Sequence, residues 1–165
     1  AHADNVAPSI LGGFTIATGD GVHSVDADIP LVACLPEIAV STRDARQVVP
    51  ETASMEQVVE TVGNAATLTA GMYRSDPELV GRGMGDPLVT PARAKLITGY
   101  EAVERAAREA GAVGVTVSGA GPSMLAVCRD HRRRDVAGAM LDAFADEGVD
   151  ARAYQTRVSR GARLL

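Results

Sequence analysis

The chain has 165 residues, of which 46% are apolar and 3% are aromatic, and its formal net charge at pH 7 is −5. This length suits one domain, or one domain with a piece of another, and the apolar fraction allows a core of aliphatic side chains. The acidic balance argues against binding of a nucleic-acid backbone, and no apolar run approaches the length of a membrane span.

The first thirty residues predict a short helix followed by a β-hairpin. The chain begins without a methionine, and we expect it to be a fragment that lacks an N-terminal part. Asp4 or Asn5 can cap the helix, which the glycines at 12–13 end. Two β-like runs then flank a Gly-Asp-Gly turn, at residues 14–17 and 22–27.

The next segment predicts one buried strand and two helices. Residues 31–40 are mostly apolar and predict a strand that bends or ends near its internal proline. A short helix follows near Ser41. The second helix is longer, because Ser54 and Gln57 form a capping box, and Gly63 within it favours close packing of a neighbour. Helical spacing places apolar side chains on one face, which we expect to be packed: Met55, Val58, Val59, Val62, Ala65, Ala66, Thr69 and Met72.

The rest of the chain supplies the remaining strands of the expected sheet. In order, it predicts a helix at 77–81, a helix begun by Thr90 and Pro91, a helix begun by a capping box of Thr98 and Glu101, strands at 113–117 and 124–128, a helix capped by Asp130, and a strand at 149–156. From residue 31 this is a βαββαβ order with additional helices after the first strand, which is ferredoxin-like. We therefore predict an α+β fold with helices on one face of an antiparallel sheet.

The loop between the strands at 113–117 and 124–128 has the sequence SGAGPS. Dinucleotide sites and P-loops need a glycine turn that opens directly into a helix, whereas here a strand follows. A strand–loop–strand turn can still bind an anion, because successive backbone N–H groups form a concave nest. The simpler interpretation is a hairpin turn that glycine makes easy, and composition alone favours it.

Two cysteines and one basic run do not indicate a metal or nucleic-acid site. Cys34 and Cys128 each lie in an apolar run without a second Cys or a spaced His, so we predict buried free thiols and a reducing compartment. The basic run at 131–134 is flanked by Asp130 and Asp135, which is typical of a solvated helix start.

Four stretches of the sequence resemble a known family, and they occur in the family's order. They are HADNVAPSILGGF at 2–14, STRDARQVVP at 41–50, ARAKLITGYEAV at 92–103 and GAVGVTVSGAGPSMLAV at 111–127. Together they resemble the C-terminal half of the homoserine kinases, within the GHMP small-molecule kinase superfamily. The resemblance implies that residues 1–29 are the tail of an N-terminal domain and that 30–165 form the C-terminal domain.

The resemblance also implies a reaction and its cofactors. The family transfers a phosphoryl group from ATP, with Mg²⁺, to L-homoserine in threonine biosynthesis, and the product is O-phospho-L-homoserine. The ATP loop and the residues that hold Mg²⁺ are absent from this sequence, so the chain alone is expected to be inactive. A cytoplasmic enzyme is implied, with no nucleic-acid or membrane partner, and a homodimer is compatible with the fold.

The resemblance assigns roles to residues at both ends of the substrate. Asp4 is the candidate partner of the substrate ammonium, with His2 and Asn5 nearby; the alternative for Asp4 and Asn5 is a helix N-cap. Arg46 and Arg93 are candidate clamps for the carboxylate, because a planar guanidinium meets a carboxylate with two hydrogen bonds. The alternative for each is a surface arginine, and Arg43 competes with Arg46.

The resemblance places the glycine loop beside the phosphates of ATP. The loop residues implied at this position are Ser118, Gly119, Ala120, Gly121 and Pro122. Positioning and charge stabilisation dominate phosphoryl transfer, so no residue of this chain is assigned as a catalytic base or metal ligand.

Two other functions remain open on the sequence. One is another GHMP kinase, of the mevalonate or shikimate type. The other is a non-catalytic, amino-acid-binding regulatory module, because fold alone does not determine function.

Overall fold

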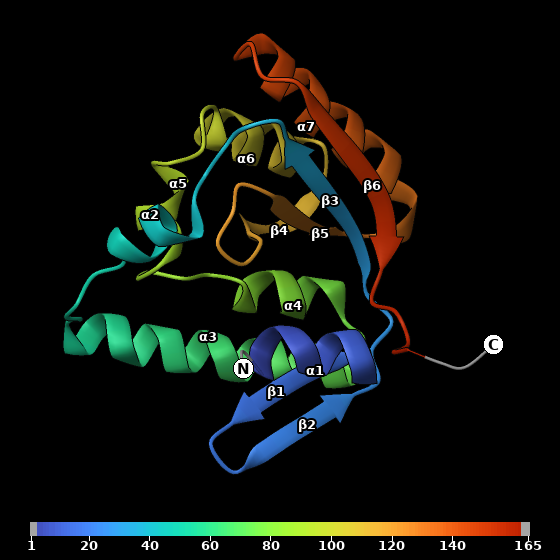
Figure 1. The fold of residues 1–165 in the computed structure, drawn as a ribbon. Helices are drawn as coiled ribbons and strands as arrows, with labels where there is room; N and C mark the ends of the chain where they lie inside the picture. The colour runs from blue at the N-terminus through green and yellow to red at the C-terminus, as the bar shows by residue number, and fades with distance from the viewer. Residues whose placement is uncertain (1–2, 163–165) are drawn as a thin grey trace.

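A computed structural model describes residues 3–162, and it confirms the expected α+β class (Figure 1). The first elements form a small unit. Helix α1 (Ala3–Leu11) precedes an antiparallel hairpin of β1 (Phe14–Thr18) and β2 (Gly21–Val25). Gly12 follows α1 with φ +69°, which agrees with the predicted end of that helix.

A four-stranded antiparallel sheet forms the centre of the larger unit. Its strands are β3 (Pro30–Pro36), β4 (Ala112–Val117), β5 (Met124–Cys128) and β6 (Ala151–Arg157), and their spatial order is β4-β5-β3-β6. Among the four strands of this sheet, β3 comes first in the sequence, and it lies between β5 and β6. This is the strand order of a ferredoxin-like βαββαβ fold.

Two helices cover one face of this sheet. They are α6 (Tyr100–Glu109) and α7 (Arg133–Asp146), which follows a 3₁₀ turn, η1 (Asp130–Arg132). Alternate residues of the strands point toward them, because successive side chains of a strand face opposite sides. The largest fully buried members of this core are Val32, Cys34, Val103, Met124, Cys128, Val136, Met140 and Phe144.

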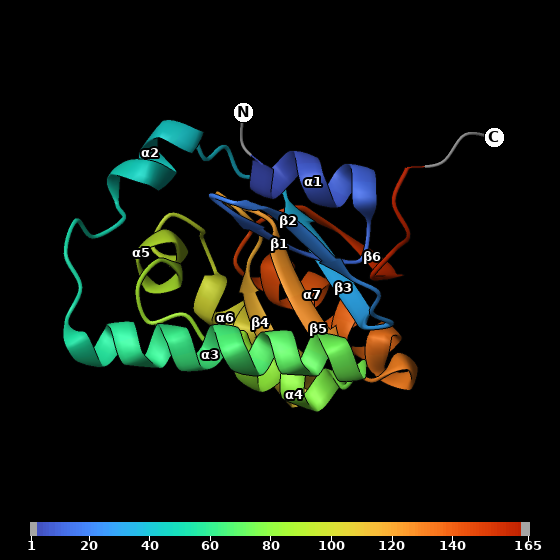
Figure 2. The same ribbon diagram turned by 90° about the horizontal axis from the view of Figure 1, so that it is seen from below.

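The additional helices cover the opposite face, which the expectation of helices on one face did not include. Helix α4 (Pro77–Gly83) packs on β4 and β5, and α3 (Met55–Arg74) packs on α4 (Figures 1 and 2). Ile29, Val80 and Val127 are fully or almost fully buried in this second core. The second face of the sheet is therefore covered at β4 and β5, whereas most residues of β6 are exposed.

Helix α3 does not bury the apolar face that its sequence predicts. Its capping box is present, since Ser54 and Gln57 exchange hydrogen bonds of 3.0 and 3.2 Å. However, Met55 is 75% exposed, Val59 66% and Val62 64%. Burial is confined to the C-terminal end of the helix, where α4 packs against it, so the prediction of a packed face is wrong for the N-terminal half.

One helix begins as predicted, and three begin differently from the prediction. Helix α2 (Thr42–Gln47) has the expected cap, in which Asp44 N–H donates to Ser41 Oγ at 3.0 Å. Helix α5 (Thr90–Ala94) has no side-chain cap, and α6 is preceded by Gly99 at φ +79° rather than by a capping box. Asp130 does not cap α7 directly, because η1 intervenes.

Both cysteines are buried free thiols, as predicted. Burial raises the pKa of the Cys34 thiol to about 11 and also raises the pKa of Cys128. Neither thiol has the lowered pKa of a reactive cysteine.

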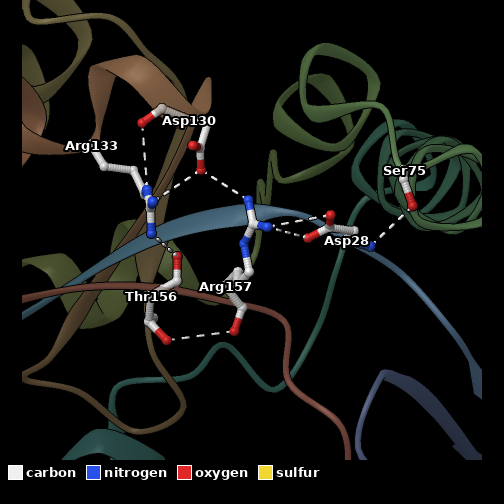
Figure 3. Close-up of polar contacts among 6 residues, drawn as sticks. All are labelled: Asp28, Ser75, Asp130, Arg133, Thr156 and Arg157. Atoms are coloured by element: carbon white, nitrogen blue, oxygen red, sulfur yellow. Dashed lines mark hydrogen bonds and ion pairs between the residues drawn. The ribbon is translucent and has the colours of Figure 1, made fainter.

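A network of ion pairs fastens the segment between β2 and β3 to the larger unit (Figure 3). The Arg157 guanidinium lies between Asp28 at 3.2 Å and Asp130 at 2.8 Å, and Arg133 also pairs with Asp130 at 3.0 Å. On the other side, Asp28 N–H donates to Ser75 Oγ at 3.0 Å. One arginine therefore joins three parts of the chain.

Substitution of Arg157 tests how much this network contributes to the free energy of unfolding. Arg157 and its two aspartate partners are substantially exposed, so we expect Arg157→Ala to lower the free energy of unfolding by about 1 kcal/mol at low salt. In about 1 M NaCl the loss should shrink, because salt screens exposed charges. Chemical denaturation at both ionic strengths measures the difference.

Arg134→Ala is the matched control for this experiment. Arg134 is exposed on α7 and has no ionic partner within residues 3–162. The control removes the same charge without breaking a pair. Equal losses for Arg157→Ala and Arg134→Ala at both salt concentrations would show that the network contributes nothing specific.

Candidate functional site

The glycine loop is a compact turn between β4 and β5, as the sequence predicts. Ser118 N–H donates to Ser123 O at 2.7 Å, and Gly121 N–H donates to Ser118 O at 2.9 Å. Gly119 and Gly121 have φ values of +57° and +81°, a region that favours glycine. A side chain at Gly121 would also meet Val117 Cγ1 at 3.2 Å, so the loop lies close to the core.

Arg93 connects the glycine loop to helix α2. Its Nη1 donates to Gly119 O at 2.7 Å, and its Nε donates to Ala45 O at 3.1 Å. Arginine has five N–H groups, so three remain after these two bonds. Arg93 is therefore held by backbone carbonyls and still has donors for a further anion.

Arg46 follows the residue whose carbonyl accepts the bond from Arg93. Ala45 is fully buried, whereas Arg43 and Arg46 are both exposed on α2. Exposure alone does not separate the two candidates.

The N-terminal candidates lie on or before α1. His2 lies outside the described residues, and Asp4 is placed by its backbone within α1. Because α1 begins at Ala3, Asp4 and Asn5 belong to its first turn, and the N-cap interpretation of these two residues is wrong. Asn5 is exposed, and its carbonyl accepts a 2.9 Å hydrogen bond from Ser9 Oγ. The N-terminal end of α1 lies on the same side of the molecule as α2 (Figure 2).

A turn at Asp86 organises the start of α5, and the sequence prediction missed it. Asp86 Oδ1 accepts hydrogen bonds from the N–H groups of Leu88 and Val89, at 2.9 and 3.0 Å. Asp86 Oδ2 accepts from Thr90 N–H at 2.7 Å and from Thr90 Oγ1 at 2.9 Å. Val89 precedes α5 and Thr90 is its first residue, so the predicted N-cap role of Thr90 is wrong; its N–H and hydroxyl instead bond to Asp86. An acidic residue four positions before a Thr-Pro pair is the only sequence signal for this turn.

The same hydrogen bonds set the charge state of Asp86. Partial burial acts to raise the pKa of its carboxyl group, but the bonds from Val89, Leu88 and Thr90 outweigh burial. The pKa of Asp86 is therefore lowered from its ordinary value, and the group is a carboxylate at neutral pH. Thr90 Oγ1 also lies 3.2 Å from Thr116 Oγ1 on β4.

A cavity lies beside this turn, and the glycine loop does not line it. Its volume is about 830 Å³, and it is lined by Asp86, Thr90 and residues of α5 and α6 that include Tyr100 and Arg108. Arg93 does not line it either. No group of three or more His, Cys, Asp or Glu side chains within residues 3–162 is arranged to hold a metal ion. No helix in this range is long and apolar enough to cross a membrane.

Comparison with known proteins identifies close relatives. Residues 68–147 match a family profile described as GHMP kinases C terminal. Over its full length, the chain is 72% identical to a homoserine kinase of Halorubrum lacusprofundi and 70% identical to a homoserine kinase of Haloarcula marismortui. It covers 56% and 57% of these proteins, so the chain spans about half the length of the curated relatives it matches.

A solved structure shares the fold in detail. The crystal structure of a homoserine kinase from Cytophaga hutchinsonii superimposes with a TM-score of 0.92 at 35% identity. The match covers 98% of this chain and 53% of that one. The helices on both faces of the sheet therefore belong to a known arrangement.

Proposed function

Because the chain contains a GHMP kinase C-terminal domain, we propose that the full-length protein phosphorylates L-homoserine with ATP. The products are ADP and O-phospho-L-homoserine, in threonine biosynthesis in the cytoplasm. The observation that carries the proposal is the 72% identity to a homoserine kinase across all 165 residues. A mevalonate- or shikimate-type kinase, or a non-catalytic module, has no comparable support.

The arrangement of α2, α5 and the glycine loop supports a substrate site between them. Arg46 and Arg93 supply positive charge for the substrate carboxylate, and Asp4 supplies negative charge for the ammonium, with His2 and Asn5 beside it. The loop of residues 118–122 lies near the phosphates of ATP in this proposal. Ser118 N–H and Gly121 N–H are used within the loop and Pro122 has no N–H, so the amide donors for phosphate are those of Gly119 and Ala120. In phosphoryl transfer these groups act by positioning and by charge stabilisation.

Mg²⁺ is part of the proposed reaction, but we assign none of its ligands to this chain. A hard divalent cation is held by carboxylate oxygens and phosphates, and the described residues contain no such carboxylate cluster. When bound with ATP, Mg²⁺ would supply positive charge that neutralises the phosphates.

We further propose that residues 1–29 complete an N-terminal domain and that 30–165 form the C-terminal domain. Two observations support this division. The hairpin of β1 and β2 forms its own two-stranded sheet, apart from the four-stranded sheet. Apolar side chains are exposed on α1 and, separately, on α3, among them Ile10 and Val59, and another part of the protein can cover such side chains.

A kinase assay on the full-length gene product tests the proposed function. Phosphorylation of homoserine is expected to exceed that of mevalonate and shikimate by at least about a hundredfold in kcat/KM, because neither rival substrate carries the ammonium that Asp4 binds. Asp4→Ala should raise KM for homoserine. Residues 1–165 alone should give no turnover.

Three results would contradict the proposal. If the full-length protein prefers another alcohol, that alcohol and not homoserine is its substrate. Binding of homoserine without phosphorylation by the full-length protein would favour the regulatory module. Turnover by residues 1–165 alone would contradict the assignment of the ATP loop to another part of the protein.

A further inference from the structure

The turn at Asp86 is hydrogen-bonded to Thr90 at the start of α5, and Thr90 in turn contacts Thr116 on β4, the strand that leads into the glycine loop. Arg93, on the same helix, bonds to Gly119 in that loop. We propose that Asp86 and Thr90 are positioning residues, which fix α5 so that Arg93 and the glycine loop keep one relative geometry. This inference rests on the proposed function, because the geometry that Asp86 and Thr90 fix is that of the proposed substrate site.

The first step is the attachment of α5 to Asp86. The four hydrogen bonds to the Asp86 carboxylate come from consecutive residues, 88–90, and they span 2.7–3.0 Å. Helix termini leave N–H groups without intrahelical partners, and here the carboxylate accepts them. The helix therefore starts at a defined point, although it is only five residues long.

The second step carries this geometry to Arg93. Arg93 lies three residues after Thr90, so both side chains occupy the same side of a short helix. A rotation of α5 that breaks the bonds at Thr90 also moves the Arg93 guanidinium. That guanidinium needs two carbonyls, at Ala45 and Gly119, in fixed positions.

The third step is a second attachment to the strand that leads into the loop. Thr90 Oγ1 contacts Thr116 Oγ1 at 3.2 Å, and Thr116 lies two residues before Ser118 on β4. Helix α5 is therefore joined to the β4–loop segment at two points, through Thr116 and through Gly119. Two points of attachment fix the rotation of a helix, which one point does not.

Two side chains of helix α3 donate hydrogen bonds to the backbone of the turn at Asp86. Asn64 Nδ2 donates to Gly85 O at 2.9 Å, and Gln57 Nε2 donates to Pro87 O at 3.2 Å. A side chain at Gly85 would lie 2.9 Å from Asn64 Nδ2, which shows how closely the two segments approach. The turn is therefore held by contacts on both sides.

Thr90→Val in the full-length protein tests the proposal. Valine keeps the shape of threonine but removes the bonds to Asp86 and Thr116. We expect kcat/KM for homoserine to fall about tenfold, mainly through KM, because loss of a hydrogen bond to a charged group has an effect of this order. Thr90→Ser keeps the hydroxyl group and should retain most of the wild-type kcat/KM. Thr67→Val removes an equivalent hydroxyl on the exposed face of α3 and should leave kcat/KM unchanged.

A double-mutant cycle with Arg93 separates positioning from a general loss of structure. If Thr90 acts through Arg93, Thr90→Val should lower kcat/KM by less than about twofold in an Arg93→Ala background. The same tenfold loss in both backgrounds would overturn the proposal. If Thr90→Val does not fold, Thr116→Val removes the shared hydroxyl contact from the strand side and is read in the same cycle.

Failure of the proposed function gives a different result from failure of this inference. A wild-type protein that does not phosphorylate homoserine contradicts the function. The positioning is then read from hydrogen exchange at the Arg93 Nε–H group, which Thr90→Val should accelerate at least about fivefold if it loosens the bond to Ala45. Unchanged exchange in that variant would overturn the positioning role.

Discussion

Gly81→Ala is expected to destabilise the protein by about 3 kcal/mol, because α4 packs on the sheet without room for a side chain. A Cβ atom at Gly81 would lie 2.5 Å from Val113 O and 2.6 Å from its carbonyl carbon. These are backbone atoms of β4, so the contact cannot be relieved by a change of rotamer. The facing glycine on β4, Gly114, has its own Cβ position 2.7 Å from Gly81 Cα.

Gly63→Ala is the matched control, since it places the same methyl group on another helix. No atom lies within 4 Å of a Cβ at Gly63. Alanine is favoured over glycine in a helix interior, so this change should stabilise the protein by about 0.5–1 kcal/mol. Urea denaturation of both variants measures the two effects. A Gly81→Ala variant as stable as the wild type would show that α4 can move away from β4 without loss.

The two glycines also show why packing is harder to predict than secondary structure. Each lies in a helical pattern, and the sequence favoured Gly63 as the site of close packing. That prediction is wrong, because the close approach occurs at Gly71 and Gly81 instead, where Cβ atoms would meet Val80 N at 2.6 Å and Val113 O at 2.5 Å. Local sequence does not tell which face of a helix a distant strand will touch.

The positions of the strands along the chain and the two serine-capped helix starts could be predicted because their signals are local. The alternation of apolar runs placed β3 to β6 in sequence, and the serine caps at 41 and 54 act within three residues. The start of α5 was missed because Asp86, four residues upstream, accepts hydrogen bonds from the N–H and the hydroxyl of Thr90, so Thr90 lies inside the helix and does not cap it. The apolar stripe of α3 was recognised, but its exposure depends on which elements pack against it.

The candidate site residues were found by resemblance to a known family. Their contacts could be predicted neither from that resemblance nor from the residue pattern. The two acceptors of Arg93 are backbone carbonyls, and they lie 48 and 26 residues away in the sequence. Every residue has a carbonyl, so no residue type marks these positions. Only the fold brings Ala45 and Gly119 to the same guanidinium.

Arg93→Ala in the full-length protein is expected to lower kcat/KM for homoserine about a hundredfold, because one change removes the proposed charge-assisted contact to the substrate carboxylate and the link between α2 and the glycine loop. Arg93→Lys keeps the positive charge but not the planar fork that reaches Ala45 O and Gly119 O together. We expect a loss of about tenfold for lysine, since one ammonium on a flexible stem holds fewer acceptors in fixed directions.

Lys95→Ala is the control for this pair, since Lys95 is an exposed cation on the same helix segment and makes no contact with the glycine loop within the described residues. It should leave kcat/KM unchanged. The three variants separate charge from geometry. If Arg93→Lys retains full activity, positive charge alone is sufficient and the two backbone bonds have no role in turnover. If Arg93→Ala also retains it, the substrate carboxylate is bound elsewhere, and the bonds to Ala45 and Gly119 serve the fold alone.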